Sequence, residues 1–258
     1  RIDPESLKNN TITPNAFASA SKDCTYYEGL AAYTDGDNFD KALAEEYKTT
    51  AIEELTAAGA TFPIKMLMCY NPTSANWAQE CQVVEQQIET VLGADYVDII
   101  IQAGPETGFL GAIRRTGKYA FMKCNWGADY ADPETWTDPF STDSSYSFIF
   151  KSTDPETQAL YAEYTELVAA AKAITDDMDA RYTAFAKAEA FLLDHAFAVP
   201  FSISNRSYQM CNLNVFEGQY ASFGMANQRY KDQHLYDTSM GLEEYQAAYA
   251  EWQSKKAG

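Results

Sequence analysis

The sequence is short of the residues that metal and nucleic-acid sites require. Only two histidines, His195 and His234, occur among 258 residues, so we expect no histidine-based metal centre and no cofactor. Lysines and arginines number 19 against 37 aspartates and glutamates, which gives a formal net charge of -18. Binding to nucleic acid or to an anionic membrane surface needs a basic face. We therefore predict no nucleic-acid partner and no direct membrane adsorption.

Cysteines with a recognisable spacing are also missing. The five cysteines are scattered, their number is odd, and no C-x-x-C pair occurs. This pattern is neither a disulfide framework nor a zinc site. Buried free thiols are the expected state of these five residues, which are Cys24, Cys69, Cys81, Cys124 and Cys211.

Segments typical of membrane proteins and nucleotide enzymes are absent as well. No apolar run is long enough to cross a bilayer, and no leader peptide is visible. The sequence holds no G-x-S-x-G elbow, no P-loop and no G-x-G-x-x-G motif. The chain starts at Arg1 without a methionine, so we expect a fragment of a longer protein.

The middle of the chain alternates between helical and strand-like patterns. Helices are predicted over 39–58, 74–92 and 106–115, and strands over 62–70, 96–102 and 119–126. We expect Asn38 and Gly59 to bound the first helix, and Ser74 and Gly93 to bound the second. This order of elements predicts an α/β layer with crossover helices.

The second half of the sequence favours helices. Apolar spacing predicts them over 155–174 and 177–195, and Asp154-Pro155 is an N-cap followed by a first-turn proline. Two strands, 197–203 and 208–213, and a last helix over 242–255 are predicted to follow. No linker divides the chain, so a single domain is expected.

The richest candidate site follows the third predicted strand. Trp126 and Tyr130 supply ring faces there, Gly127 allows a tight backbone path, and Asp129 supplies an anion. Ligand crevices in open α/β sheets lie at the carboxyl ends of strands. Such a group can hold a small cation, for example a peptide's α-ammonium, between aromatic walls.

The same residues admit other interpretations. Asp132 can cap a helix that Pro133 opens, and the tryptophans can belong to the core. Asp129 and Glu134 can be the acid and nucleophile of a glycosidase, although acids adjacent in sequence rarely reach that geometry. Nearby, the consecutive Arg114 and Arg115 are expected on different sides of a helix, mostly solvated, where one could reach a ligand carboxylate.

Three segments in this order resemble the solute-binding proteins of peptide ABC importers. Residues 41–60, with Ala-Ile-Glu-Glu-Leu-Thr-Ala-Ala-Gly, are similar to the family's helix before a strand. Residues 125–133 are similar to its Trp-x-Ala-Asp-Tyr-x-x-Pro segment. Residues 181–201, with Ala-Lys-Ala-Glu and then Ala-Val-Pro, are similar to its next helix and strand. The resemblance covers about residues 40–213.

For the fold, this resemblance implies a mixed-sheet α/β lobe of the type II, peptide-binding class of periplasmic binding proteins. The whole chain, 1–258, would be the carboxy-terminal one of two lobes, with the amino-terminal lobe absent. Residues 1–38 would be an irregular connecting arm, 39–213 the lobe, and 214–258 a segment returning to the other lobe.

For function, the resemblance implies a binding protein and not an enzyme, with Asp129 in the position of the carboxylate that holds a peptide's α-amino group. The expected ligand-binding residues are Asn125, Trp126, Gly127, Ala128, Asp129 and Tyr130. No arginine opens the helix after Asn71-Pro72, which favours an oligopeptide over a dipeptide. An oligosaccharide-binding member of the superfamily and a carboxylate-dependent glycoside hydrolase remain the alternatives.

The implied partners are an oligopeptide and the permease subunits of the importer. The implied location is extracytoplasmic, either the periplasm or the cell surface. There the full-length protein would touch the membrane only through a lipid anchor.

Overall fold

The fold begins with a helix, a strand, a crossover helix and a second strand. The computed structural model describes residues 9–14, 26–31, 39–130, 132–146, 148, 151–203, 211–218, 220 and 230–256. The first elements of this core are α2 (Lys41–Ala57), β1 (Ile64–Tyr70), α3 (Trp77–Leu92) and β2 (Val97–Ala103). β1 and β2 pair in parallel from Ile64 opposite Val97 to Tyr70 opposite Ala103. Parallel neighbours require a crossover, which α3 supplies.

The two strands form because their inward side chains are apolar and bury against α3. Met68 and Ile99 are each 2% exposed and pack with Cys81 of α3. Both strands were predicted within two residues of their observed bounds. The described residues show this two-stranded parallel sheet, extended by one parallel bridge between Met68 and Phe121.

That single bridge replaces the third predicted strand. The N–H of Ala120 donates to the carbonyl of Leu67 at 2.8 Å, and beyond Phe121 the segment leaves the sheet. The strand predicted over 119–126 is therefore wrong for most of its length. Its apolar residues belong to a loop whose side chains and amides bind another element instead.

Helix ends follow local signals with some corrections. Asp40 caps α2, because its carboxylate accepts the amides of Ala42 and Leu43 at 2.9 and 3.0 Å, whereas Asn38 lies outside the described residues. Gly59 (φ +81°) and Gly93 (φ +94°) end the two helices in left-handed conformations, as predicted.

Two predicted helices start differently from expectation. α3 begins at Trp77, after Asn76 at φ +65°, and Ser74 does not cap it. The helix predicted over 106–115 is two short pieces, α4 (Phe109–Ala112) and the 3-10 helix η2 (Arg114–Thr116). Gly108 and Gly117, both in the left-handed region, bracket this broken helix.

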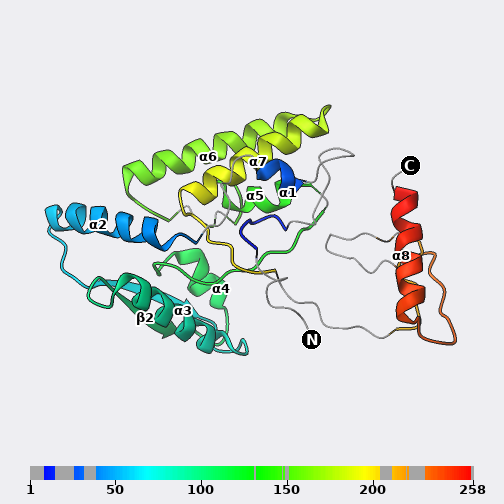
Figure 1. Ribbon diagram of the computed structural model, residues 1–258, viewed down its shortest axis with the longest axis horizontal. Helices are drawn as coiled ribbons and strands as arrows, with labels where there is room; N and C mark the ends of the chain where they lie inside the picture. Colours follow the sequence, from blue (N-terminus) through cyan, green and yellow to red (C-terminus); the bar gives the residue numbers. More distant parts are fainter. Residues whose placement is uncertain are drawn as a thin grey trace.

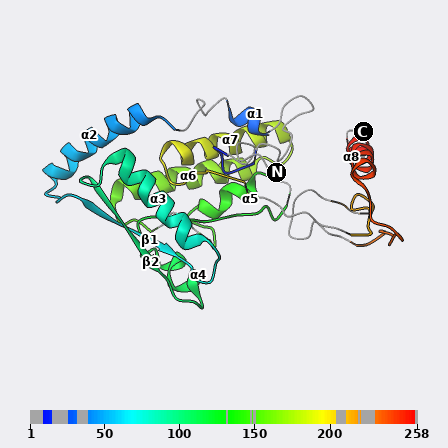
Figure 2. The ribbon, with the colours of Figure 1, turned by 60° about the horizontal axis from the view of Figure 1, so that its bottom comes forward.

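The main hydrophobic core lies in a helical hairpin formed by α6 (Pro155–Ala173) and α7 (Met178–Asp194). Asp154 and Asp177 cap these helices, as the sequence indicates for Asp154. The short helices α1 (Tyr26–Leu30) and α5 (Glu134–Thr137) pack on the hairpin, and the 3-10 helix η3 (Asp138–Phe140) follows α5. Figures 1 and 2 show this group beside the sheet, α3 and α4.

Part of the segment 1–38, predicted to be irregular, is helical. Its described residues include α1, whose Tyr26 and Leu30 are 1% and 0% exposed. Residues 9–14 carry no helix or strand and reach the middle of α7. There Glu189, fully buried, accepts the amides of Ile12 and Thr13 at 2.7 and 3.0 Å.

The strand predicted over 197–203 is reduced to a single bridge position at Ser202. Phe197 instead packs its ring 4.9 Å from that of Tyr161 in the helical core, while Val199 and Phe201 are 79% and 62% exposed. Of the strand predicted over 208–213, residues 208–210 lie outside the described part, and Leu213 makes an isolated antiparallel bridge with Leu235.

The last helix, α8 (Leu242–Lys256), matches its prediction and lies apart from the other helices in both ribbon views. Phe216 packs its ring against four aromatic rings, those of Tyr220, Tyr245, Tyr249 and Trp252.

Two expectations from composition are settled by burial and geometry. Cys69 and Cys81 are buried free thiols, as predicted, but Cys124 is exposed and Cys211 partly exposed; Cys24 lies outside the described residues. Across the described ranges, none of the helices has the length and apolar character needed to cross a bilayer.

Candidate functional site

The loop at 125–130 links the sheet to α5 and carries all six predicted ligand residues. Asn125, Gly127, Asp129 and Tyr130 are exposed, and Trp126 and Ala128 are half-buried. Tyr130 keeps 48% of its surface accessible. The loop therefore presents its anion and one ring to solvent, as a binding surface requires.

Two hydrogen bonds from a single residue of α5 fix this loop. The indole N–H of Trp126 donates to the carbonyl oxygen of Thr135 at 2.6 Å. The backbone N–H of Asp129 donates to the Thr135 hydroxyl oxygen at 3.0 Å. Within the described part of the chain, no donor reaches the Asp129 carboxylate. Asp129 itself is exposed to solvent.

Aromatic rings flank the loop on one side. Trp126 lies 4.7 Å from the ring of Tyr146 and 5.7 Å from that of Phe148, both edge-on. Phe148 in turn stacks under the guanidinium of Arg114 at 4.0 Å. The ring of Trp126 therefore connects the predicted site to a second group of side chains.

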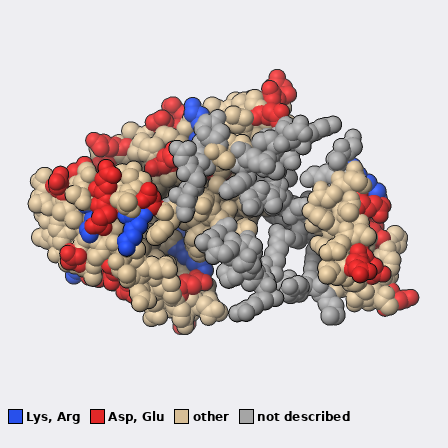
Figure 3. All heavy atoms as spheres, viewed as in Figure 1, with Lys and Arg blue, Asp and Glu red and all other residues tan. Residues whose placement is uncertain are grey.

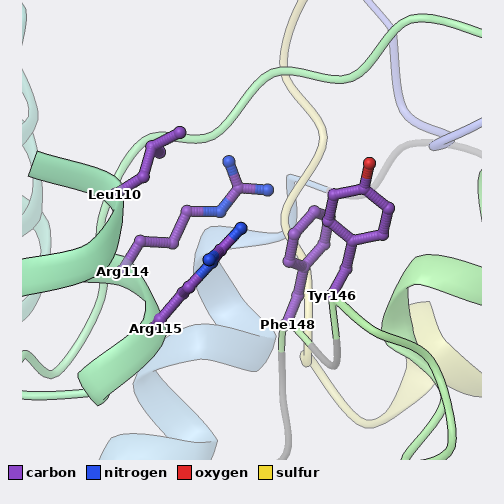
Figure 4. Close-up of a pocket in the computed structure, with 5 residues that line it drawn as sticks. All are labelled: Leu110, Arg114, Arg115, Tyr146 and Phe148. Carbon is purple, nitrogen blue, oxygen red and sulfur yellow. The ribbon is translucent and has the colours of Figure 1, made fainter. Parts of the chain in front are cut away.

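These side chains line a pocket next to the loop (Figure 4). Its walls are Leu110, Arg114, Arg115, Tyr146 and Phe148. Both arginines extend toward the rings, so the expectation that they point to different sides is wrong. The helix predicted here is interrupted, because α4 ends at Ala112 and both arginines lie in the separate 3-10 helix η2.

Arg114 has spare hydrogen-bonding capacity in this pocket. Its Nη2 is buried, and among the described residues it has no hydrogen-bond partner. A buried guanidinium nitrogen without an acceptor is costly, so a ligand carboxylate that reached it would be bound favourably. Among the charged side chains visible in Figure 3, the acidic ones are more prominent than the basic ones, in keeping with 37 acidic against 19 basic residues.

An ion-pair cluster below the loop was missed by sequence reasoning. Arg181 of α7 donates from Nε and Nη2 to both carboxylate oxygens of Asp132, at 2.9 and 3.0 Å. Its Nη2 also lies 2.7 Å from Glu134, which Lys172 approaches at 3.5 Å. The hydrogen bonds to Asp132 raise the pKa of Arg181 further. The sequence placed Arg181 inside the helix predicted over 177–195, and no local pattern pointed to its acidic partners.

This cluster decides between the interpretations of the acidic residues. Asp132 accepts the amide of Glu134 at 2.9 Å, but α5 begins at Glu134 with Pro133 in the N-cap position, so the helix starts one residue later than predicted. Trp136 is 5% exposed and belongs to the core, as the alternative interpretation expected. Glu134 is engaged by two cations, and burial beside Glu134 and Asp132 raises the pKa of the Tyr130 hydroxyl.

Across the described ranges, histidines, cysteines and carboxylates nowhere gather in a set of three or more that could hold an ion.

The chain is similar to named binding proteins of streptococci. Oligopeptide-binding protein AmiA of Streptococcus pneumoniae is 30% identical over 85% of this chain and 35% of its own length. Oligopeptide-binding protein AliA of the same species is 31% identical over 85% of this chain and 36% of its own length. No protein-family model matches the chain.

Solved structures show the fold. The substrate-binding domain of an oligopeptide ABC transporter from Bacillus anthracis superposes with a TM-score of 0.64 at 22% identity, over 89% of this chain and 41% of that one. A peptide-binding protein of a peptide ABC transporter gives 0.60 at 22% identity, over 77% and 80% of the two chains. The expected α/β class of peptide-binding proteins is therefore confirmed.

These comparisons give the fold class of the chain and the proteins to which it is homologous. The fold is that of the type II, peptide-binding class of periplasmic binding proteins. Within it, the chain is homologous to part of the oligopeptide-binding proteins of ABC transporters. It spans about a third of the length of these first relatives, 35% and 36%.

Proposed function

We propose that the chain is the ligand-holding lobe of an oligopeptide-binding component of an ABC importer, and that it is not an enzyme. The observation that carries the proposal is the homology over 85% of the chain to two oligopeptide-binding proteins. In this proposal residues 39–213 form the carboxy-terminal lobe and 214–258 return to a second lobe. Closure of the two lobes then buries the peptide.

Asp129 is the proposed anchor for the peptide's α-ammonium group. Its carboxylate is exposed, and its backbone is fixed by Thr135 at 3.0 Å. Trp126 and Tyr130 bracket the ammonium with ring faces, which favours a cation. Asn125, Gly127 and Ala128 offer main-chain groups for an extended peptide, a mode that gives affinity without sequence specificity.

The arginine pocket is the proposed second anchor. Arg114 and Arg115 supply guanidinium donors for a peptide carboxylate, either the terminal one or that of a side chain. The rings of Tyr146 and Phe148 form apolar walls for the adjoining side chain. One anion and two cations at neighbouring points suit a zwitterionic peptide better than a neutral sugar.

A hydrolase would need two carboxylates free to exchange protons. Glu134 and Asp132 are instead held by Arg181 at 2.7 and 2.9 Å. Capture followed by delivery to permease subunits needs no such chemistry. The proposed location is extracytoplasmic, with the full-length protein in the periplasm or anchored to the cell surface by a lipid.

The test is a nitrogen-15 NMR titration of the chain. The probes are penta-alanine, N-acetyl-penta-alanine and maltohexaose. We expect penta-alanine to shift the amides of 125–130 with a dissociation constant of about 1 mM, because one lobe makes only part of the contacts. Acetylation should weaken binding several-fold, and Asp129→Asn should remove that difference.

Three outcomes would refute the proposal. Shifts of these amides by maltohexaose and not by penta-alanine would indicate an oligosaccharide-binding protein. No shift with any of the three probes at saturating millimolar concentrations would show that this loop binds none of these ligands. Cleavage of a probe during the titration would restore the hydrolase interpretation.

A further inference from the structure

The loop with the predicted ligand residues is tied down by one buried side chain. Thr135 is 4% exposed and lies in α5. Its hydroxyl oxygen accepts the N–H of Asp129 at 3.0 Å, and its carbonyl oxygen accepts the indole N–H of Trp126 at 2.6 Å. One residue therefore sets where the anion and the ring stand relative to each other.

α5 is a short helix, so its own position needs support from outside. Arg181 provides it through the bidentate contact with Asp132 and the 2.7 Å contact with Glu134. Asp132 lies just before α5, and Glu134 is its first residue. A bidentate guanidinium–carboxylate pair fixes direction as well as distance.

The guanidinium of Arg181 also binds the carboxyl end of α6, the first helix of the hairpin. Its Nη1 donates to the carbonyls of Ala171, Lys172 and Ile174, at 3.3, 3.1 and 3.1 Å. Carbonyls in the last turn of a helix have no partner within that helix. Arg181 satisfies those at the end of α6, and all of its nitrogens are used. The loop is thus connected to the core through α5.

We propose that Thr135 is a positioning residue that presets Asp129 for a peptide's α-ammonium group, with Arg181 holding α5 in place. The inference rests on the proposed function, since it needs Asp129 to be the ammonium anchor. A carboxylate fixed before binding loses less freedom when the ligand arrives. Thr135 itself is buried and makes no contact with the ligand in this arrangement.

The experiment compares Thr135→Val, which keeps the shape and removes the hydroxyl, with Thr135→Ser, which keeps the hydroxyl. Two quantities are measured by NMR on the chain: hydrogen exchange of the Asp129 amide, and the affinity ratio of penta-alanine to N-acetyl-penta-alanine. In Thr135→Val we expect faster exchange and a ratio lowered about fivefold, the worth of one neutral hydrogen bond. Thr135→Ser should restore both, and affinity for the acetylated peptide should stay constant.

An equal loss of affinity for both peptides in Thr135→Val would show a merely structural role and overturn the proposal. An unchanged ratio would overturn it too. If Asp129→Asn still removes the preference for a free amino group in that case, the proposed function stands. If Asp129→Asn leaves the ratio unchanged, the proposed function itself fails.

Arg181→Lys keeps the proposal testable if Thr135→Val does not fold. A lysine retains the charge but loses the bidentate geometry. We expect this variant to lower the ratio as well, with affinity for the acetylated peptide preserved. An unchanged ratio in Arg181→Lys would then overturn the proposal.

Discussion

Glu189 accepts both the backbone N–H and the hydroxyl of Thr13, at 3.0 and 2.5 Å, although 176 positions separate the two residues. The carboxylate is fully buried and also accepts the hydroxyl of Tyr26 at 3.3 Å. It therefore joins residues 9–14, the short helix α1 and the middle of α7.

Removing this carboxylate should destabilise the chain strongly. Glu189→Ala leaves two buried amides and two hydroxyls without their acceptor, so we expect a loss of about 3–5 kcal/mol. Urea unfolding measures the loss, and Glu166→Ala on the exposed face of α6 is the matched control. A loss in Glu189→Ala no larger than in the control would show that these hydrogen bonds do not stabilise the fold.

The stability that Glu189 contributes should also depend on pH. Burial raises the pKa of this carboxyl above its ordinary value of 4.5. A raised pKa means that the contribution is complete below about pH 4.5 and is lost as the pH rises through the folded-state pKa. Relative to Glu189→Gln, the wild type should therefore lose stability between acidic and neutral pH. If the difference between the urea midpoints of the wild type and Glu189→Gln stays constant from acidic to neutral pH, the predicted pH dependence is wrong.

We expect Arg181 to contribute more to the free energy of unfolding than the exposed Lys187 on the same helix. Arg181→Met strips the counter-charge from Asp132 and Glu134, and we expect a loss of about 3 kcal/mol in the free energy of unfolding. Lys187→Ala, on the exposed face of α7, should change it by less than about 0.5 kcal/mol. Urea unfolding of both variants checks this, and similar losses would show that the cluster is energetically neutral.

Gly104 is required by a close approach to α4. A Cβ there would lie 2.6 Å from the ring of Phe109, which packs against Trp77 at 5.4 Å. We expect Gly104→Ala to cost about 1–3 kcal/mol through overpacking. Gly111→Ala is the control, because nothing lies within 4 Å of its built Cβ, and a helical alanine should stabilise by about 0.5–1 kcal/mol. Thermal unfolding distinguishes the two variants. Equal shifts of their unfolding temperatures would contradict the close approach of Phe109 to Gly104.

We expect Arg114 to contribute more than Arg115 to binding of a peptide carboxylate in the pocket. Its Nη2 is buried without a described partner, whereas Arg115 is exposed. Arg114→Gln should weaken binding of penta-alanine about tenfold, with a smaller effect on its carboxy-terminal amide, since a charged hydrogen bond is lost. Arg115→Gln should weaken binding of penta-alanine less than Arg114→Gln does. Lys118→Gln, the control, should leave the affinity unchanged. Equal losses for acid and amide would mean that the pocket does not bind the carboxylate.

Local signals in the sequence predicted what depends on a few neighbouring residues. Asp154-Pro155 begins α6, and Gly59 and Gly93 end α2 and α3, because caps and left-handed turns involve only adjacent backbone groups. The parallel pair β1 and β2 followed from short apolar runs. The loop at 125–130 was located by its residue types and its place after the sheet.

What the sequence did not reveal depends on contacts between distant segments. The apolar run at 119–126 suits a strand, but Trp126 and Asp129 bind Thr135, and one bridge remains. Arg181 was seen only as the start of a motif, since its partners Asp132 and Glu134 are 49 and 47 positions away. The pocket that Arg114 and Arg115 share is completed by Tyr146 and Phe148, which come from a later part of the chain.

The ring contacts of Phe216 all fall within 216–252, and its described partners belong to the same terminal segment. Stabilising energy shared only among neighbours couples weakly to the rest of a molecule. The terminal segment should therefore unfold independently of the α6–α7 hairpin. A substitution in the α6–α7 hairpin would leave its amide protection unchanged, and calorimetry would record two transitions in place of one.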